Sequence, residues 1–400
     1  MLLTRTQFHN YMNVRQVGGG FKKGLQMYAS YRERLQGGSS ECSAMADIDY
    51  DGFMQKLFDA KDCHSLAKKY CTPEMAKKYK GKKTKLGGTL AHCIKPGAQF
   101  HHLHIGIYAC DPEAYQLFAE VFDKVVAEYH KVPPGQPITH PPPNFGDLNN
   151  LPFGDLDPEG KYVISTRVRV GRSVDGIPFP PLINLKQVKD CEARLVNALK
   201  TFSGDLAGQY YSLEGMDEPT KQKLIDDHFL FGDPPNKILV GAGVEPDWPK
   251  GRGIFHNNNK TFLAWLNEED HIRIISMQMG GNLAEVYKRL VTAIQHIEKT
   301  VKFAHDPRLG YLTFCPSNLG TTCRASVHIK IPKVSALKNF NGIVDCLGLQ
   351  LRGTAGEHTE AVGGVWDVSN KRRLGYSEID ALTEMATGVK LLILLEKSLE

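Results

Sequence analysis

The 400-residue sequence lacks the short signatures by which many nucleotide-binding enzymes are identified. There is no G-x-x-x-x-G-K-[ST] phosphate loop, because Gly81-Lys82-Lys83-Thr84 has no glycine upstream at the required spacing. No G-x-G-x-x-G turn follows a strand, and no catalytic loop of the protein-kinase type is found. A nucleotide site in this chain must therefore be built from other residues.

Cysteine spacing, charge and hydropathy exclude further classes. The nine cysteines are odd in number and never spaced C-x-x-C, which argues against a disulfide framework or a zinc site and favours a reducing compartment. The net charge of +5 is too small to indicate nucleic-acid binding, and no apolar run reaches the ~18 residues that span a bilayer. We therefore expect a cytoplasmic protein with neither a nucleic acid nor a membrane as its partner.

The first part of the chain divides into three segments. Residues 1–44 hold six Lys/Arg and two acids, which resembles an organellar (mitochondrial) transit peptide; the alternatives are an unstructured extension and an upstream start before Met45. Residues 45–131 show helical spacing and the start signal Thr72-Pro73-Glu74, which predict a small all-α domain. Residues 132–155 form a predicted linker, because six prolines fall between Pro133 and Pro143.

The second part, residues 156–400, changes to a period of two. Its hairpin-like strand pairs predict an antiparallel β-sheet flanked by α-helices, so the whole chain is assigned to the α+β class. The predicted strands are 162–170, 261–266, 271–277, 311–314 and 324–331, and the predicted helices are 187–202, 217–228, 282–298 and 377–397.

Strand alternation gathers cationic side chains on one face. In the segment 324–331, Arg324, Ser326 and His328 alternate with apolar residues. The apolar face of such a strand can pack into a core, and the opposite, cationic face can bind a polyanion. Arg167 and Arg169 stand two residues apart, roughly 6–7 Å along a strand, a distance at which two guanidinium groups can bracket neighbouring phosphates. A solvated strand face is the alternative.

Acidic residues and a cysteine complement these arginines. The turn Glu268-Glu269-Asp270 and the Gly-bearing segment 352–360 offer carboxylates that suit a cationic acceptor such as a guanidinium. Cys315 has Ser317 two residues on, and nearby arginines are expected to lower the pKa of its thiol. The alternatives are a turn acid in solvent for Glu269 and a buried apolar role for Cys315.

Several motifs together resemble the phosphagen (ATP:guanidino) kinase family over residues 46–400. They are CPSNLGTTCRASVHIKIP at 315–332, STRVRVGRS at 165–173, IDDHFLF at 225–231, WPKGRGIFHN at 248–257, NEEDHIRIISMQMGG at 267–281 and RGTAGEHTE at 352–360. The resemblance implies the guanidino kinase fold, shared with glutamine synthetase, and reversible transfer of the γ-phosphoryl group of MgATP to a guanidino nitrogen. Magnesium would be carried by the nucleotide, with no protein metal ligands.

The resemblance also implies roles for individual residues. Glu269 and Glu357 would clamp the guanidinium, with Cys315 as a thiolate partner and Arg273 as a further catalytic group. The implied nucleotide-binding residues are Ser165, Arg167, Arg169, His228, Arg273, Arg324, Ser326, His328 and Arg352. Acceptor binding would use His104, Ile105, Gly106 and Tyr108 from the loop at 101–108, together with Glu269, Cys315 and Glu357.

The resemblance implies that the loop at 101–108 decides which acceptor is bound. Glu357 resembles the arginine kinase pattern, but His102 stands where arginine kinases carry an Asp, and its partner region reads Pro235-Asn236-Lys237. The His/Ile pattern of the loop resembles flatworm taurocyamine kinases, so taurocyamine is the favoured acceptor and arginine the second. Monomer and homodimer are both open.

Two other classes are alternatives. One is a guanidine-modifying enzyme that uses Cys315 covalently without ATP, which leaves the arginines unexplained. The other is a non-catalytic nucleotide-binding protein, which the full set of matched catalytic positions disfavours.

Overall fold

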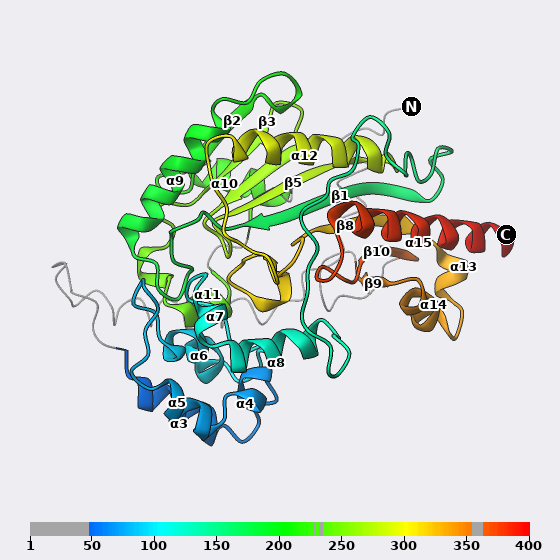
Figure 1. The fold of residues 1–400 in the computed structure, drawn as a ribbon. Coiled ribbons are helices and arrows are strands. Elements are labelled where there is room, and N and C mark those ends of the chain that lie inside the picture. Colours follow the sequence, from blue (N-terminus) through cyan, green and yellow to red (C-terminus); the bar gives the residue numbers. More distant parts are fainter. Residues whose placement is uncertain (1–47, 228, 232–234, 354–362) are drawn as a thin grey trace. The chain divides into compact units, whose positions relative to one another are not determined.

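The computed structural model describes residues 48–227, 229–231, 235–353 and 363–400 (Figure 1). The predictions for residues 1–44, His228 and Glu357 lie outside the described residues. In the part of the chain that is described, every helix is too short or too polar to cross a membrane.

The first described part is helical, as the sequence predicts. Thr72 caps its helix by accepting a hydrogen bond from the Met75 N–H at 3.3 Å, with Pro73 at the first helical position. The Asp111 carboxylate likewise accepts from the Ala114 N–H at 2.9 Å. The helices are α3 (Tyr50–Asp59), α4 (Leu66–Tyr70), α5 (Pro73–Tyr79), α6 (Leu90–Gln99), α7 (Ala114–Leu117) and α8 (Ala119–Tyr129).

No helix or strand lies between Tyr129 and Val163 in the structure, across the proline-rich segment. The exact domain boundaries at 45, 131 and 155 remain sequence-based predictions.

In the second part, the described residues form one antiparallel sheet of eight strands in the order β2-β3-β4-β5-β1-β8-β10-β9. All of its strand pairs are antiparallel, which confirms the predicted sheet. The strands are β1 (Val163–Arg172), β2 (Gly208–Ser212), β3 (Gly253–Asn257), β4 (Phe262–Leu266), β5 (Ile272–Met279), β8 (Arg324–Lys330), β9 (Leu349–Arg352) and β10 (Val365–Asn370).

Helices cover one face of this sheet (Figure 1). The helices that contribute to the core on this face are α9 (Leu185–Leu199), α12 (Leu283–Glu298), α13 (Pro332–Ser335), α14 (Phe340–Cys346) and α15 (Glu378–Ser398). Two other helices lie elsewhere: α10 (Glu218–Asp226) supplies Leu224 to a smaller apolar cluster with Ile254 and Leu263, and α11 (Lys237–Ala242) packs against α6. Apolar residues of α9, α12 and α15 pack with those of the strands into the main core. Ser377 caps α15 with a reciprocal capping box to Asp380.

The apolar side of β8 confirms the alternation. Ala325, Val327 and Ile329 have no solvent exposure and belong to the main core. Burial of these side chains on one face leaves the opposite face of β8 for polar groups.

One strand prediction is wrong. The segment 311–314 does not form a strand of the main sheet, because only Gly310–Tyr311 (β7) pairs, with His305–Asp306 (β6), in a separate two-stranded sheet. Phe314 instead joins a second core that is shared with the helical part, where its ring stacks on Tyr108 with centroids 4.9 Å apart. Contacts with the helical part, which sequence periodicity does not report, thus replace strand pairing here.

Candidate active site

The polar side chains of neighbouring strands lie on one face of the sheet. Residues that stand opposite each other in an antiparallel pair share a face, so the register decides which side chains meet. β10 adds Asp367 opposite His328, and β9 adds Arg352 opposite Asp367. The pairs between β1 and β8 are Arg169 with Arg324, Arg167 with Ser326, and Ser165 with His328.

We call this side of the sheet, which carries Arg167, Arg169, Arg324 and Arg352, the arginine face. It concentrates positive charge. Burial and the neighbouring Arg324 lower the pKa of Arg167 to about 10, although Asp367 partly opposes this. Burial, followed by Arg273 and Arg167, holds the pKa of Arg169 well below its usual range. Like charges gathered in this way bind a polyphosphate well, since the anion relieves their mutual repulsion.

One carboxylate is built into the face. The Arg324 guanidinium donates to Asp367 at 2.9 Å and, more weakly, to the Ser326 hydroxyl at 3.4 Å. Arg324 is only 5% exposed, so this ion pair holds it in place in the sheet.

One end of the face is apolar. Trp265 lies opposite Arg273 in the β4–β5 pair, and its ring lies 5.8 Å from the Arg167 guanidinium. Trp265 and Met277 border a small apolar cluster that includes Phe229 and Ile275.

At the other end, the Ser165 hydroxyl lies 3.2 Å from Nδ1 of His328. Ser165 and His328, two of the residues expected near the nucleotide, therefore lie together.

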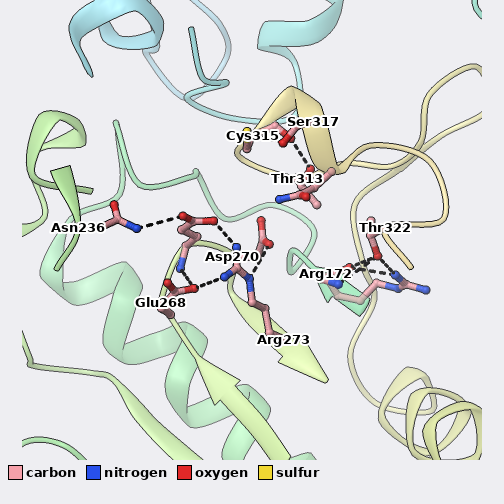
Figure 2. Close-up of polar contacts among 12 residues, drawn as sticks. Arg172, Asn236, Glu268, Asp270, Arg273, Thr313, Cys315, Ser317 and Thr322 are labelled. Atoms are coloured by element: carbon pink, nitrogen blue, oxygen red, sulfur yellow. Dashed lines mark hydrogen bonds and ion pairs between the residues drawn. The ribbon is translucent and has the colours of Figure 1, made fainter. Parts of the chain in front are cut away.

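The acidic turn between β4 and β5 surrounds a single arginine (Figure 2). Arg273 makes an ion pair with Glu268 at 2.6 Å, a hydrogen-bonded ion pair with Glu269 and a longer contact with Asp270 at 3.4 Å. Burial would lower the pKa of Arg273, but the three carboxylates outweigh it and raise the pKa above its usual value. Arg273, expected among the phosphate ligands, thus lies between the acidic turn and the other arginines.

The two glutamates of the turn differ in charge. Burial, reinforced by the charge of Glu269, raises the pKa of Glu268 to about 7. Burial alone would also raise the pKa of Glu269. Arg273 and a hydrogen bond from Asn236 outweigh this effect, so the pKa of Glu269 lies below its usual value. Glu269 is therefore the ionised carboxylate that suits a guanidinium.

Asn236 supports Glu269 from the start of α11. Its side-chain amide donates to Oε1 of Glu269 at 3.2 Å, and its Oδ1 accepts from the Leu239 N–H at 3.0 Å as the N-cap of the helix. Asn236 therefore connects the acidic turn to α11, which packs against α6.

We expect Asn236→Ser to keep the cap of α11 but to lose the donor to Glu269. The pKa of Glu269 then rises, and since the ionised form is lost as pH falls through that pKa, the acidic limb of kcat/KM moves to higher pH. We expect kcat/KM to fall about threefold to tenfold at neutral pH, as a hydrogen bond to a charge suggests. A pH–rate profile measures both effects. Lys237→Ala is the control, and a Ser variant with the profile of that control would contradict the supporting role.

Cys315 lies at the contact between the sheet part and the helical part. Its Sγ lies 3.0 Å from the Ser317 hydroxyl, as expected, at the start of a short helical turn, Pro316–Asn318 (η3) (Figure 2). The expectation that arginines lower the pKa of this thiol is wrong for this structure. Burial raises the pKa to about 12, and Glu269 adds to the rise while Ser317 opposes it. A thiol in this state is a poor nucleophile, which disfavours the covalent alternative.

Groups of the helical part hold the extended segment that leads to Cys315. The Ala109 N–H donates to the Phe314 carbonyl at 2.9 Å, and the Tyr115 hydroxyl donates to the Thr313 carbonyl at 2.8 Å. Next to them, Nε2 of His130 lies 2.9 Å from the Pro316 carbonyl. The predicted acceptor loop ends at Tyr108, and the next residue, Ala109, is hydrogen-bonded to the residue before Cys315. The end of the loop therefore lies close to the cysteine in space.

The loop at 101–108 is anchored by its backbone. The Leu66 and Ala67 N–H groups donate to the carbonyls of His104 and Ile105, each at 2.9 Å. Gly106 has φ of +70°, and a Cβ there would lie 2.8 Å from Ser65, so glycine is required. Ile105 and Tyr108 are buried, whereas His104 is exposed with its ring 6.4 Å from that of Tyr129.

The structure therefore gathers most of the predicted site and adds to it. Glu357 and His228 are outside the described residues, so their predicted roles are not tested. Sequence reasoning missed Asp367, although its alternation with Val368 in β10 could have indicated it. It placed Trp265 in a predicted strand and Asn236 in the partner region of His102 but assigned neither a role in the site, and it missed Arg373, for which no local pattern exists. Among the described residues, no group of three or more His, Cys, Asp or Glu side chains is placed to hold a metal ion.

Comparison with known families gives two matches on this chain. The family described as ATP:guanido phosphotransferase, C-terminal catalytic domain, matches residues 190–399. The corresponding N-terminal domain matches residues 61–127.

Individual relatives agree with this match. The chain is 55% identical to an arginine kinase from Liolophura japonica, over 86% of this chain and 97% of that protein. It is 53% identical to a taurocyamine kinase from Schistosoma mansoni, over 84% of this chain and 45% of that protein.

Solved structures show the same fold. The substrate-free duplicated taurocyamine kinase from Schistosoma mansoni superposes with a TM-score of 0.82 at 50% identity, covering 90% of this chain and 50% of that one. This chain thus spans about half the length of that protein. A lombricine kinase superposes with a TM-score of 0.80 at 41% identity, covering 84% of this chain and 93% of that one.

Proposed function

Because the chain belongs to the ATP:guanido phosphotransferase family, it is a phosphagen kinase, and we propose that taurocyamine is its favoured acceptor, with arginine second. The reaction is the reversible transfer of the γ-phosphoryl group of ATP to a guanidino nitrogen, which stores phosphoryl groups for energy buffering.

The geometry of the site supports this chemistry. Phosphoryl transfer is catalysed mainly by positioning and by neutralising charge, and the arginine face supplies fixed positive charge without a phosphate loop. In our proposal Arg167, Arg169, Arg324 and Arg352 hold the nucleotide phosphates, and Mg²⁺ arrives with the nucleotide. Ser165, Ser326 and His328 lie along the same face and contribute to the nucleotide site.

The acidic turn is proposed to hold the acceptor. Glu269 pairs with one guanidinium, that of Arg273, which supports a role for its carboxylate in binding this group. A second guanidinium beside Cys315 and Glu269 would favour the thiolate, because a neighbouring positive charge lowers a thiol pKa. Cys315 then acts as a charge partner of the acceptor, and the phosphoryl group passes directly without a covalent enzyme intermediate.

The acceptor loop supports taurocyamine on chemical grounds. Its residues 101–108 contain no carboxylate that could recognise the α-amino group of arginine, and they do contain His102 and His104. Imidazole and backbone N–H groups can donate to a sulfonate, which is the group that taurocyamine carries in place of an amino acid tail. This absence of a carboxylate in the loop, together with exposed imidazoles, is the observation on which the preference rests.

A coupled ADP-release assay with arginine, taurocyamine, creatine, glycocyamine and lombricine tests the proposal. We expect the highest kcat/KM with taurocyamine, and we expect His104→Ala to raise the KM for taurocyamine about tenfold while the KM for ATP is unchanged. His101→Ala is the matched control, since the His101 ring lies against the Ala98 carbonyl at 3.2 Å. A preference for creatine would contradict our interpretation of both Glu357 and the loop.

Three further points are proposals as well. We expect a cytoplasmic enzyme, or a mitochondrial one if residues 1–44 direct transport. Its substrates are a small guanidine and MgATP, and monomer and homodimer are both compatible with them.

A further inference from the structure

Arg373, a residue outside the arginine face, contacts the loop that carries Cys315. Its side chain donates from Nη1 to the Ser317 carbonyl at 2.9 Å and to Oδ1 of Asn318 at 2.7 Å. Both acceptors belong to the short helical turn that begins directly after Cys315. Arg373 therefore holds the loop close to the thiol.

The main chain of Arg373 holds the other end of the same loop. Its carbonyl accepts from the Thr321 N–H at 2.9 Å and from the Thr321 hydroxyl at 3.2 Å. Gly320 packs so closely that a Cβ there would lie 2.2 Å from this carbonyl oxygen. A single residue thus fixes the loop at Ser317–Asn318 and again at Gly320–Thr321.

The far end of the loop is secured by a second arginine (Figure 2). Arg172 is completely buried, and its Nη1 donates to Oγ1 of Thr322 at 2.8 Å and to the Thr321 carbonyl at 3.3 Å. β8 begins two residues later, at Arg324. Movement of the loop would therefore displace Cys315 at one end and Arg324 at the other.

The guanidinium of Arg373 is held in an unfavourable place. It is 9% exposed, its Nε has no hydrogen-bond partner in the described part of the chain, and no carboxylate pairs with it there. Burial, with Arg324 and Arg352 nearby, lowers its pKa. The acceptors of the loop compensate for burying this charge. Loss of the hydrogen bonds to Ser317 and Asn318 would leave donors of a buried guanidinium unpaired, which costs free energy.

We propose that Arg373 is a positioning residue that fixes the Cys315–Thr321 loop and thereby aligns Cys315, on the acceptor side, with Arg324, on the nucleotide side. The proposal rests on the phosphagen kinase function above. The proposed role is to set the placement of the two substrates relative to each other. This placement matters because a displacement of about 1 Å between reacting groups can lower the rate about a hundredfold.

The test compares Arg373→Met and Arg373→Lys with Arg372→Met. Arg372 is the matched control, since it neighbours Arg373 but is 58% exposed and pairs with Glu384 on the surface. We expect Arg373→Met to lower kcat about 10- to 100-fold with less than threefold change in the KM for ATP. Arg373→Lys should recover part of this loss, because an ammonium can still donate to one loop acceptor.

A second readout follows the loop itself. The rate at which iodoacetamide alkylates Cys315 is measured by peptide mass spectrometry, which separates it from the exposed Cys346. We expect at least fivefold faster alkylation of Cys315 in Arg373→Met, and wild-type rates in Arg372→Met. If Arg373→Met does not fold, Asn318→Ala removes the side-chain acceptor of Arg373, leaves the Ser317 carbonyl in place, and should give a smaller change of the same sign.

The outcomes separate the two proposals. Alkylation at the wild-type rate in the Arg373 or Asn318 variants would overturn the positioning role, and so would a fall in kcat without faster alkylation. Absent turnover of the wild type with every guanidine would instead overturn the proposed function, while the alkylation rates would still test the loop.

Discussion

Replacing Glu269 by Gln should lower kcat for phosphoryl transfer about 100- to 1,000-fold. Glutamine keeps the shape of the side chain but loses the negative charge that binds the acceptor guanidinium. The carboxylate is largely buried and ionised, so its charge acts in a medium that screens it weakly. Steady-state kinetics with the preferred guanidine measure the loss, and the KM for ATP should change little.

Glu268→Gln is the matched control for this prediction. Glu268 belongs to the same turn and contacts the same Arg273 at 2.6 Å. Burial raises the pKa of Glu268 above its usual value, whereas the pKa of Glu269 lies below its usual value, so a neutral glutamine is the smaller change at position 268. We expect less than a tenfold loss. Equal losses in the two variants would mean that the turn acts only by holding Arg273.

Replacing Arg169 by Met should make the enzyme nearly inactive and the ligand-free protein more stable. Arg169 faces Arg273, Arg167, Arg324 and Arg373, and no ion-pair partner for it exists among the described residues. Removing it relieves like-charge repulsion, so we expect the free energy of unfolding to rise by about 1 kcal/mol. The same change removes a phosphate ligand, and kcat/KM for ATP should fall about 1,000-fold.

Denaturant unfolding and steady-state kinetics on one preparation measure both effects. Arg194→Met, at an exposed site of α9 that pairs with Asp190, serves as the control and should change neither quantity appreciably. A less stable Arg169→Met protein would contradict the account of the face as a set of repelling charges. Loss of activity without any change in the KM for ATP would place Arg169 away from the nucleotide.

Local patterns predicted the parts of the site that lie on regular elements. Strict alternation in β8 and β1 indicated which side chains share the arginine face, because the period of a strand is two. The cap at Thr72, the turn at 267–270 and the motif around Cys315 were also readable, since each depends on neighbours in the chain. The antiparallel arrangement followed from hairpin-like spacing.

The parts that escaped prediction depend on distant contacts. Arg373 reaches Ser317 across 56 positions, and Asn236 reaches Glu269 across 33. Neither residue stands in a repeating pattern, so nothing local distinguishes Arg373 from Arg372 beside it. The composition of the segment 311–314 predicts a strand, but packing of Phe314 against Tyr108 decides its conformation.

The sequence by itself determined the family, the antiparallel sheet and the identity of most charged groups in the site. The tertiary structure alone decided their electrostatic state and alignment. Cys315 illustrates the division, since its neighbours in sequence suggested an activated thiolate, whereas burial holds it as a thiol. The physical reason is that a pKa depends on desolvation and on charges nearby in space, and both arise only when separate segments pack together.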